Sequence, residues 1–73
     1  MEPIIDEILY LVRDYYQTYQ GSPNLLLLSA DNLARLREEL ELDYMEDLYR
    51  YHGMEIQVVH DGGNDFMEVD YEI

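Results

Sequence analysis

The 73-residue sequence contains no cysteine, no lysine and no tryptophan. The absence of cysteine excludes disulfide bonds and thiolate metal sites, and it is compatible with a reducing cytoplasm. The unbroken apolar run Leu25 to Leu28 is far too short to span a bilayer. The first residues also lack the basic segment of a secretory signal. We therefore expect one soluble, cytoplasmic domain covering residues 1–73, with a small core.

The absence of lysine leaves four arginines against 17 acidic residues, and the net charge is −13. Most of the imbalance lies in the second half, where residues 38–73 hold twelve acids against Arg50 alone. With 48% hydrophobic residues and eight tyrosines, the chain is too apolar for a disordered acidic segment. We expect it to fold, not to bind nucleic acid or an anionic membrane directly, and to prefer basic protein surfaces.

The first half of the chain predicts a helix, a strand and a second helix. Apolar residues recur at spacings of three and four over residues 3–20, and Pro3 suits the first turn of such a helix. A short apolar run over residues 24–28 predicts a buried strand. Ser29 is typical of an N-cap, and the helix that it begins is expected to extend to about Leu40.

The second half predicts two strands after an ambiguous segment. Residues 42–52 are compatible with either a helix or a structured loop, whereas residues 54–58 alternate in the manner of a strand. Residues 61–64, Asp-Gly-Gly-Asn, are the strongest turn signal and predict a hairpin to the final strand. The expected fold is α+β, with two main helices packed on a small three-stranded sheet that ends in a C-terminal β-hairpin.

The last ten residues, NDFMEVDYEI, alternate between apolar and acidic side chains. Because successive side chains of a strand face opposite sides, Glu68, Asp70 and Glu72 are expected to form one acidic row about 6.6 Å apart. That spacing is of the same order as the spacing of phosphates along a nucleic-acid backbone, about 3.4 Å of axis rise and longer along the winding contour. The alternative is that the acids protect a sheet edge against aggregation.

No motif in the sequence indicates catalysis. The spacing of His52 and His60 matches no standard zinc site. An EF-hand loop beginning at Asp61 would need an oxygen ligand where Gly63 lies and glycine where Phe66 lies. The acids are consecutive or alternating on faces expected to be exposed, and no glycine-rich phosphate loop is present. We therefore expect a protein that is not an enzyme and that uses neither a metal nor a cofactor.

Tyrosines among the acids of the second half indicate a protein interface, because tyrosine is enriched in binding hot spots and stacks on arginine. Packing in the core, with the hydroxyl groups at the surface, is the alternative for these tyrosines. The candidate partner-binding residues are Glu38, Glu39, Glu41, Asp43, Tyr44, Glu46, Asp47, Tyr49, Glu68, Asp70 and Glu72.

The apolar stripe of the first helix is wide for a helix that rests on one small sheet. This width favours a homodimer with Tyr15, Tyr16 or Tyr19 in the contact. Electrostatic repulsion between two chains of charge −13 opposes the same contact.

The small size, extreme acidity, tyrosines among the acids and lack of a catalytic motif together resemble the phage-encoded DNA-mimic inhibitors, the anti-CRISPR and anti-restriction proteins. Separately, NLLLLSADNLARL followed by YHGMEIQVV is similar to a strand–helix–strand stretch of tailed-phage major capsid proteins and of small accessory proteins of mobile elements. Both resemblances imply a phage or mobile-element protein in a bacterial cytoplasm, and neither assigns a role to a residue.

Two functions are therefore expected from the sequence. The first is an acidic inhibitor that blocks the nucleic-acid site of a basic host defence protein, a CRISPR effector or restriction enzyme, by charge mimicry. The second is a structural or assembly module of a phage or mobile element that docks another protein chain.

Overall fold

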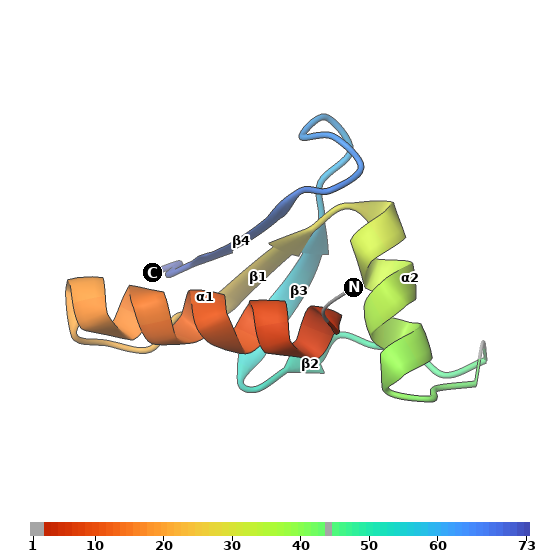
Figure 1. Ribbon diagram of the computed structural model, residues 1–73, viewed down its shortest axis with the longest axis horizontal. Coiled ribbons are helices and arrows are strands. Elements are labelled where there is room, and N and C mark those ends of the chain that lie inside the picture. The colour runs from red at the N-terminus through yellow and green to blue at the C-terminus, as the bar shows by residue number, and fades with distance from the viewer. Residues whose placement is uncertain (1–2, 44) are drawn as a thin grey trace.

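Two helices pack on a mixed four-stranded sheet in the computed structural model, which describes residues 3–43 and 45–73 (Figure 1). The predicted α+β class is confirmed. Neither helix is long and apolar enough, within the described residues, to cross a membrane. The elements in chain order are α1 (Ile4–Tyr19), β1 (Leu25–Leu28), α2 (Ala30–Glu39), β2 (Arg50–Tyr51), β3 (Met54–Val58) and β4 (Met67–Asp70).

The order of the strands, β2-β3-β1-β4, differs from the predicted three-stranded sheet with a C-terminal hairpin. Strand β1 lies between the last two strands, parallel to β3 and antiparallel to β4. Leu26 is therefore opposite Ile56 on one side and opposite Val69 on the other. Strand β1 is therefore a central strand, with both of its backbone edges paired.

The hairpin of this fold lies one turn earlier, between β2 and β3. Tyr51 pairs with Met54, and the two residues between them, His52 and Gly53, have φ angles of 50° and 77°. Positive φ at both central positions is characteristic of the type I′ turn, whose twist matches that of paired strands. Residues 42–52 thus contain no helix among the described residues. The loop alternative describes this segment up to Tyr49, whereas Arg50–Tyr51 form strand β2, which neither alternative included.

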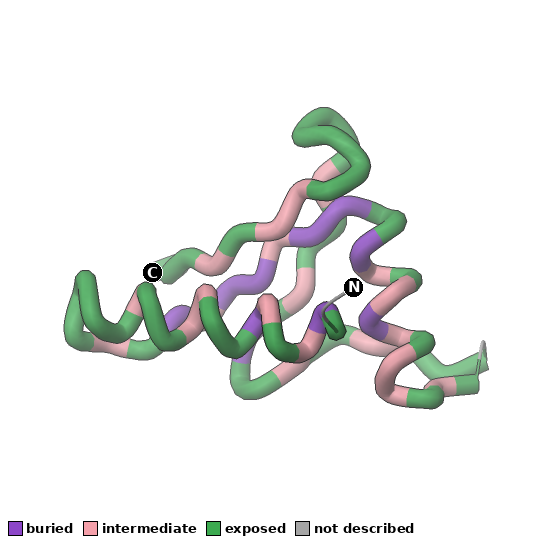
Figure 2. The backbone as a smooth tube through the Cα atoms, viewed as in Figure 1, coloured by how far each residue is buried: buried purple, intermediate pink, exposed green. Residues whose placement is uncertain are grey.

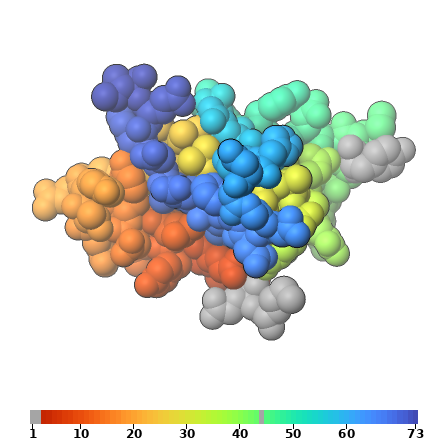
Figure 3. Space-filling model, turned by 90° about the horizontal axis from the view of Figure 1, so that it is seen from above, coloured from red at the N-terminus to blue at the C-terminus, as the bar shows by residue number. Residues whose placement is uncertain are grey.

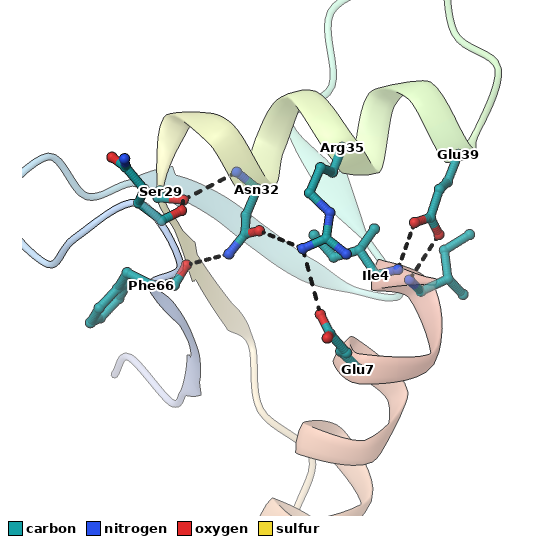
Figure 4. A network of polar contacts seen from close by, with 9 residues as sticks. Ile4, Glu7, Ser29, Asn32, Arg35, Glu39 and Phe66 are labelled. Carbon is teal, nitrogen blue, oxygen red and sulfur yellow. Dashed lines mark hydrogen bonds and ion pairs between the residues drawn. The ribbon is translucent and has the colours of Figure 1, made fainter. Parts of the chain in front are cut away.

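Polar contacts hold the start of β4 against the junction between β1 and α2 (Figure 4). The Ser29 amide donates to the Phe66 carbonyl at 3.0 Å, and the Asn32 side-chain amide donates to the same oxygen at 2.9 Å. The Ser29 hydroxyl accepts from the Asn32 amide, which confirms the predicted N-cap, and it donates to the Asn64 carbonyl at 2.6 Å. These contacts hold the chain that follows the glycine-rich turn across the end of β1. Strand β4 can therefore pair with the edge of β1 opposite to β3.

The core lies between the two helices and one face of the sheet. Figure 2 shows the buried residues concentrated on β1, on the start of α1 and on the inner side of α2. Met67 and Val69 of β4 pack against this core at its edge. The opposite face of the sheet is left uncovered by α1 and α2. The fully buried side chains are Ile4, Ile8, Leu26, Leu28, Leu36 and Met54.

Candidate protein-binding surface

The uncovered side of the sheet, called here the open face, carries an apolar centre between acidic flanks. Strand register places Leu25 between Glu55 of β3 and Asp70 of β4, and it places Leu27 between Gln57 and Glu68. At the far edge, Arg50 of β2 lies opposite Glu55, so the acidic character is strongest along β4. The open face consists of Leu25, Leu27, Glu55, Gln57, Glu68 and Asp70.

The carboxylates of the open face are exposed, as the alternation of the last strand predicts. Glu68 and Asp70 are exposed while Met67 and Val69 between them are half-buried against the helices. Neighbouring strands lie about 4.8 Å apart, so Glu55 and Asp70, on the two sides of β1, are separated by about 10 Å at the backbone. The face is therefore wide enough to meet several side chains of a partner.

Asn24 extends this acidic row beyond the end of β4. Its side-chain amide nitrogen donates to the Glu72 carbonyl at 2.8 Å, and its amide oxygen accepts from the Glu72 backbone N–H at 2.7 Å. Two hydrogen bonds thus fix Glu72 beside the start of β1, although strand pairing has ended at Asp70. No local pattern signals this contact, because it joins residues 48 positions apart.

The second group of predicted acids lies at the other end of the molecule, at the end of α2 and in the loop after it (Figure 1). The structure does not bring this group together with the open face. Asp43 accepts a hydrogen bond from the Met45 amide, and Tyr44 lies outside the described residues. The exposed members of the group are Glu38, Glu41, Asp43, Glu46, Asp47 and Tyr49.

Glu39 has a structural role that the sequence did not reveal. Its carboxylate accepts hydrogen bonds from the backbone amides of Ile4 at 2.6 Å and Ile5 at 3.1 Å (Figure 4). These amides belong to the first turn of α1, where the N–H groups have no partner within the helix and the helix dipole favours a negative charge. Pro3, at the N-cap, makes no side-chain cap of its own. The Glu39 carboxylate is therefore occupied by hydrogen bonds that link α2 to α1.

The tyrosines occupy several different environments. The rings of Tyr15 and Tyr19 stack with centroids 4.6 Å apart, and burial, followed by the negative charge of Asp70, raises the pKa of Tyr15. Tyr16 is 57% exposed. In the loop, Tyr49 donates to the Asp47 carboxylate at 2.9 Å, and this hydrogen bond raises the pKa of the Tyr49 phenol. Burial raises the pKa of Tyr51. The homodimer through α1 stays a prediction.

Few of the acidic side chains are neutralised by arginine. Among residues 3–43 and 45–73, one ion pair is shorter than 4.0 Å, and it joins Arg35 of α2 to Glu7 of α1 at 3.9 Å. Arg37 instead donates to the Asp43 carbonyl at 3.0 Å. Much of the charge of −13 therefore acts as repulsion across the surface.

We expect the melting temperature to rise between low salt and about half-molar sodium chloride, because salt ions screen this repulsion. Circular dichroism melts over a series of salt concentrations measure the effect. Sodium sulfate is an unsuitable salt, since it also strengthens hydrophobic burial. A melting temperature that stays flat or falls would contradict strong repulsion in the folded state.

Comparisons with known protein families, curated proteins and solved structures gave no match to this chain. The candidate surface is therefore defined by its own geometry. Sequence reasoning missed Glu55 as a member of the open face, although its alternation with Met54 and Ile56 already placed it on the outer side of a strand.

Proposed function

We propose that this protein is a non-enzymatic inhibitor that occupies the nucleic-acid-binding site of a basic protein. The observation that carries the proposal is the open face, on which Glu68 and Asp70 are exposed beside Leu27, with the backbone of Glu72 held by Asn24 beside the start of β1. The resemblance to phage-encoded inhibitors makes a bacterial defence protein, such as a CRISPR effector or a restriction enzyme, the expected partner.

The proposed mechanism is competition for the same cationic side chains. Lysines and arginines that hold phosphates would pair with Glu68, Asp70 and Glu72, and an arginine donates two parallel hydrogen bonds to one carboxylate. Leu27, which is half-buried, adds an apolar centre, and interfaces commonly combine such a centre with a polar rim. Polar and apolar contacts together would give the inhibitor an affinity that charge alone does not provide.

Reversing the charge of the open face tests the proposal. The variant carries Glu68→Lys, Asp70→Lys and Glu72→Lys, and a low-salt pull-down from a bacterial lysate, read by mass spectrometry, supplies the basic partner. We expect the variant to lose competition against a labelled DNA duplex for that partner. Removal of a charge paired across a desolvated interface costs about 2–5 kcal/mol. Because these side chains are exposed, each change is expected to alter the free energy of unfolding by only about 0.5 kcal/mol.

The matched control reverses three exposed acids in the other predicted group: Glu38→Lys, Glu41→Lys and Glu46→Lys. It changes the net charge by the same amount at the opposite end of the molecule. The proposal requires that this control keep most of its competition with DNA. Equal losses of competition from both variants would mean that only the net charge matters. A loss from the control alone would place the binding site at the end of α2 and in the loop after it.

The alternative function, an assembly module that docks another chain, is favoured by the exposed aromatic rings of α1. Tyr10 is 69% exposed and Tyr19 is 67% exposed, so a second chain can reach both rings, and tyrosine is enriched in binding hot spots. The two functions differ in their response to salt. Competition through carboxylates weakens steeply as salt rises, whereas docking through apolar area does not.

A further inference from the structure

A groove runs between α1 and the free edge of β4. It consists of two hollows of about 570 and 360 Å³ that share Leu11 of α1 and Met67 of β4. Figure 3 shows the blue atoms of β4 directly beside the red and orange atoms of α1. Tyrosine rings line both hollows, Tyr10 in the larger one and Tyr15 with Tyr19 in the smaller one. We call this feature the α1–β4 groove.

One wall of the α1–β4 groove is a strand edge with backbone groups available for pairing. Strand β4 pairs with β1 on one side and is the last strand of the sheet on the other. The hydrogen bond from Ser29 to the Phe66 carbonyl, together with the register, directs the even-numbered backbone groups of β4 toward β1. The N–H and C=O groups of Met67 and Val69 therefore face the groove side of the edge.

This edge ends abruptly at Tyr71. The Tyr71 amide donates to the side chain of Asp70 at 2.8 Å, so the next edge-facing N–H is already occupied. A strand added to β4 would consequently pair with Met67 and Val69 and stop there. An antiparallel partner would make about four backbone hydrogen bonds at these two positions.

The charge of the α1–β4 groove selects the chemistry of its occupant. Asp6, Asp14, Asp65, Glu68 and Glu7 line the two hollows, and Glu7 is the one that also contacts Arg35. A second copy of this chain would bring a further charge of −13 to the same place, which opposes self-association at this edge. The complementary occupant is a basic segment in an extended conformation.

We propose that the α1–β4 groove binds an extended, arginine-rich segment of another protein, which adds to β4 as an antiparallel fifth strand. Residues opposite Met67 and Val69 point their side chains to the helix side of the sheet, and each hollow receives one arginine. The arginine stem packs on Leu11 and on a tyrosine ring, and its guanidinium group reaches a carboxylate such as Asp14 or Asp65. This site is distinct from the open face, although Glu68 lines both and Asp70 of the open face occupies the Tyr71 amide where the edge ends.

The test uses a synthetic peptide, acetyl-Val-Arg-Val-Arg-Val-amide, and two N-methylated forms of it. In the proposed pairing the arginine N–H groups point to β4 and the valine N–H groups point to solvent. Methylation of the two arginine nitrogens should weaken binding about tenfold or more, because it removes two hydrogen bonds and blocks close approach. Methylation of two valine nitrogens, which leaves charge and composition identical, should change binding little. Calorimetry or fluorescence anisotropy measures the affinities.

Amide hydrogen exchange locates the peptide on the protein. We expect exchange of the Met67 and Val69 amides to slow when peptide is added, while Glu68, already paired with β1, serves as the internal reference. Equal weakening by both methylated peptides, or unchanged exchange at Met67 and Val69, would overturn strand addition. Protection of the same two amides by raising the protein concentration alone would identify a second copy as the occupant and would also overturn the proposal.

A pair of double variants separates this site from the open face. Asp14→Lys with Asp65→Lys should abolish peptide binding and leave competition with DNA in place. Glu55→Lys with Glu72→Lys, both exposed and neither lining a hollow, should retain peptide binding and lose the competition. Both variants change the net charge equally. If the open-face proposal is wrong, competition with DNA will not respond as expected; if the α1–β4 groove proposal is wrong, peptide binding will not. Equal effects of the two variants on peptide binding would overturn the assignment to the α1–β4 groove.

Discussion

Replacing Leu26 by alanine is expected to lower the free energy of unfolding by about 2–5 kcal/mol, because the change leaves a cavity at the centre of the core. Leu26 has no exposed surface, and its strand is paired on both sides. A domain of this size is expected to have a total stability of about 4–11 kcal/mol. The variant should therefore lose a large share of this stability, which urea titration followed by circular dichroism will measure.

The neighbouring leucine provides the control for this experiment. Leu27 belongs to the same strand but faces the open side of the sheet, where it is only half-buried. The Leu27→Ala change should cost about 1 kcal/mol, because less apolar surface returns to water. If the two variants were equally unstable, the assignment of the core to the helix side of the sheet would be wrong.

Removing the Glu39 carboxylate is expected to cost about 1.5–3 kcal/mol, as is usual for hydrogen bonds to a charged group. The Glu39→Ala change leaves the Ile4 and Ile5 amides without their acceptor and takes a negative charge from the start of α1. The Glu39→Gln change keeps one acceptor oxygen and should cost less. Chemical denaturation of both variants gives the free energies, and hydrogen exchange of the two amides reports the site directly.

The Glu39 experiment is informative because the expected change in stability is opposite to the change that net charge alone predicts. In a chain of net charge −13, removal of an acid should relieve repulsion and either stabilise the fold or leave it unchanged. Glu38, the exposed neighbour on α2, is the matched control, and Glu38→Ala is expected to change stability by no more than about 0.5 kcal/mol. Similar losses at both positions would contradict a specific contact between Glu39 and α1.

Local patterns predicted the elements whose stability is mostly local. The apolar periodicity of residues 3–20 corresponds to α1, and Ser29 begins α2 because its hydroxyl accepts from an amide three residues later. The alternation of the last strand was also sufficient to place Glu68 and Asp70 on the exposed side of β4. Each of these features depends on the spacing of residues within one element, which the sequence displays directly.

Pairing between distant segments was not accessible to the same reasoning. The glycine-rich turn at residues 61–64 has the composition of a hairpin, yet β1 lies between the strands that it connects. The order of the strands follows from the pairing of β1 with both β3 and β4, and no local signal in the sequence argued against a hairpin. The contacts of Glu39 with Ile4 and of Asn24 with Glu72 were missed for the same reason, because each joins residues more than 30 positions apart.

The central position of β1 also has a consequence for biosynthesis. Leu25 pairs with Glu55 and with Asp70, so both neighbours of this strand leave the ribosome 30 and 45 residues after it. Until β3 and β4 have been synthesised, the four consecutive leucines of β1 have no strand to pair with. Unpaired apolar segments of this kind are prone to aggregation. Pairing over such separations also slows folding. The sheet is therefore expected to form late and in one cooperative step, after the segment that ends in β4 has been synthesised.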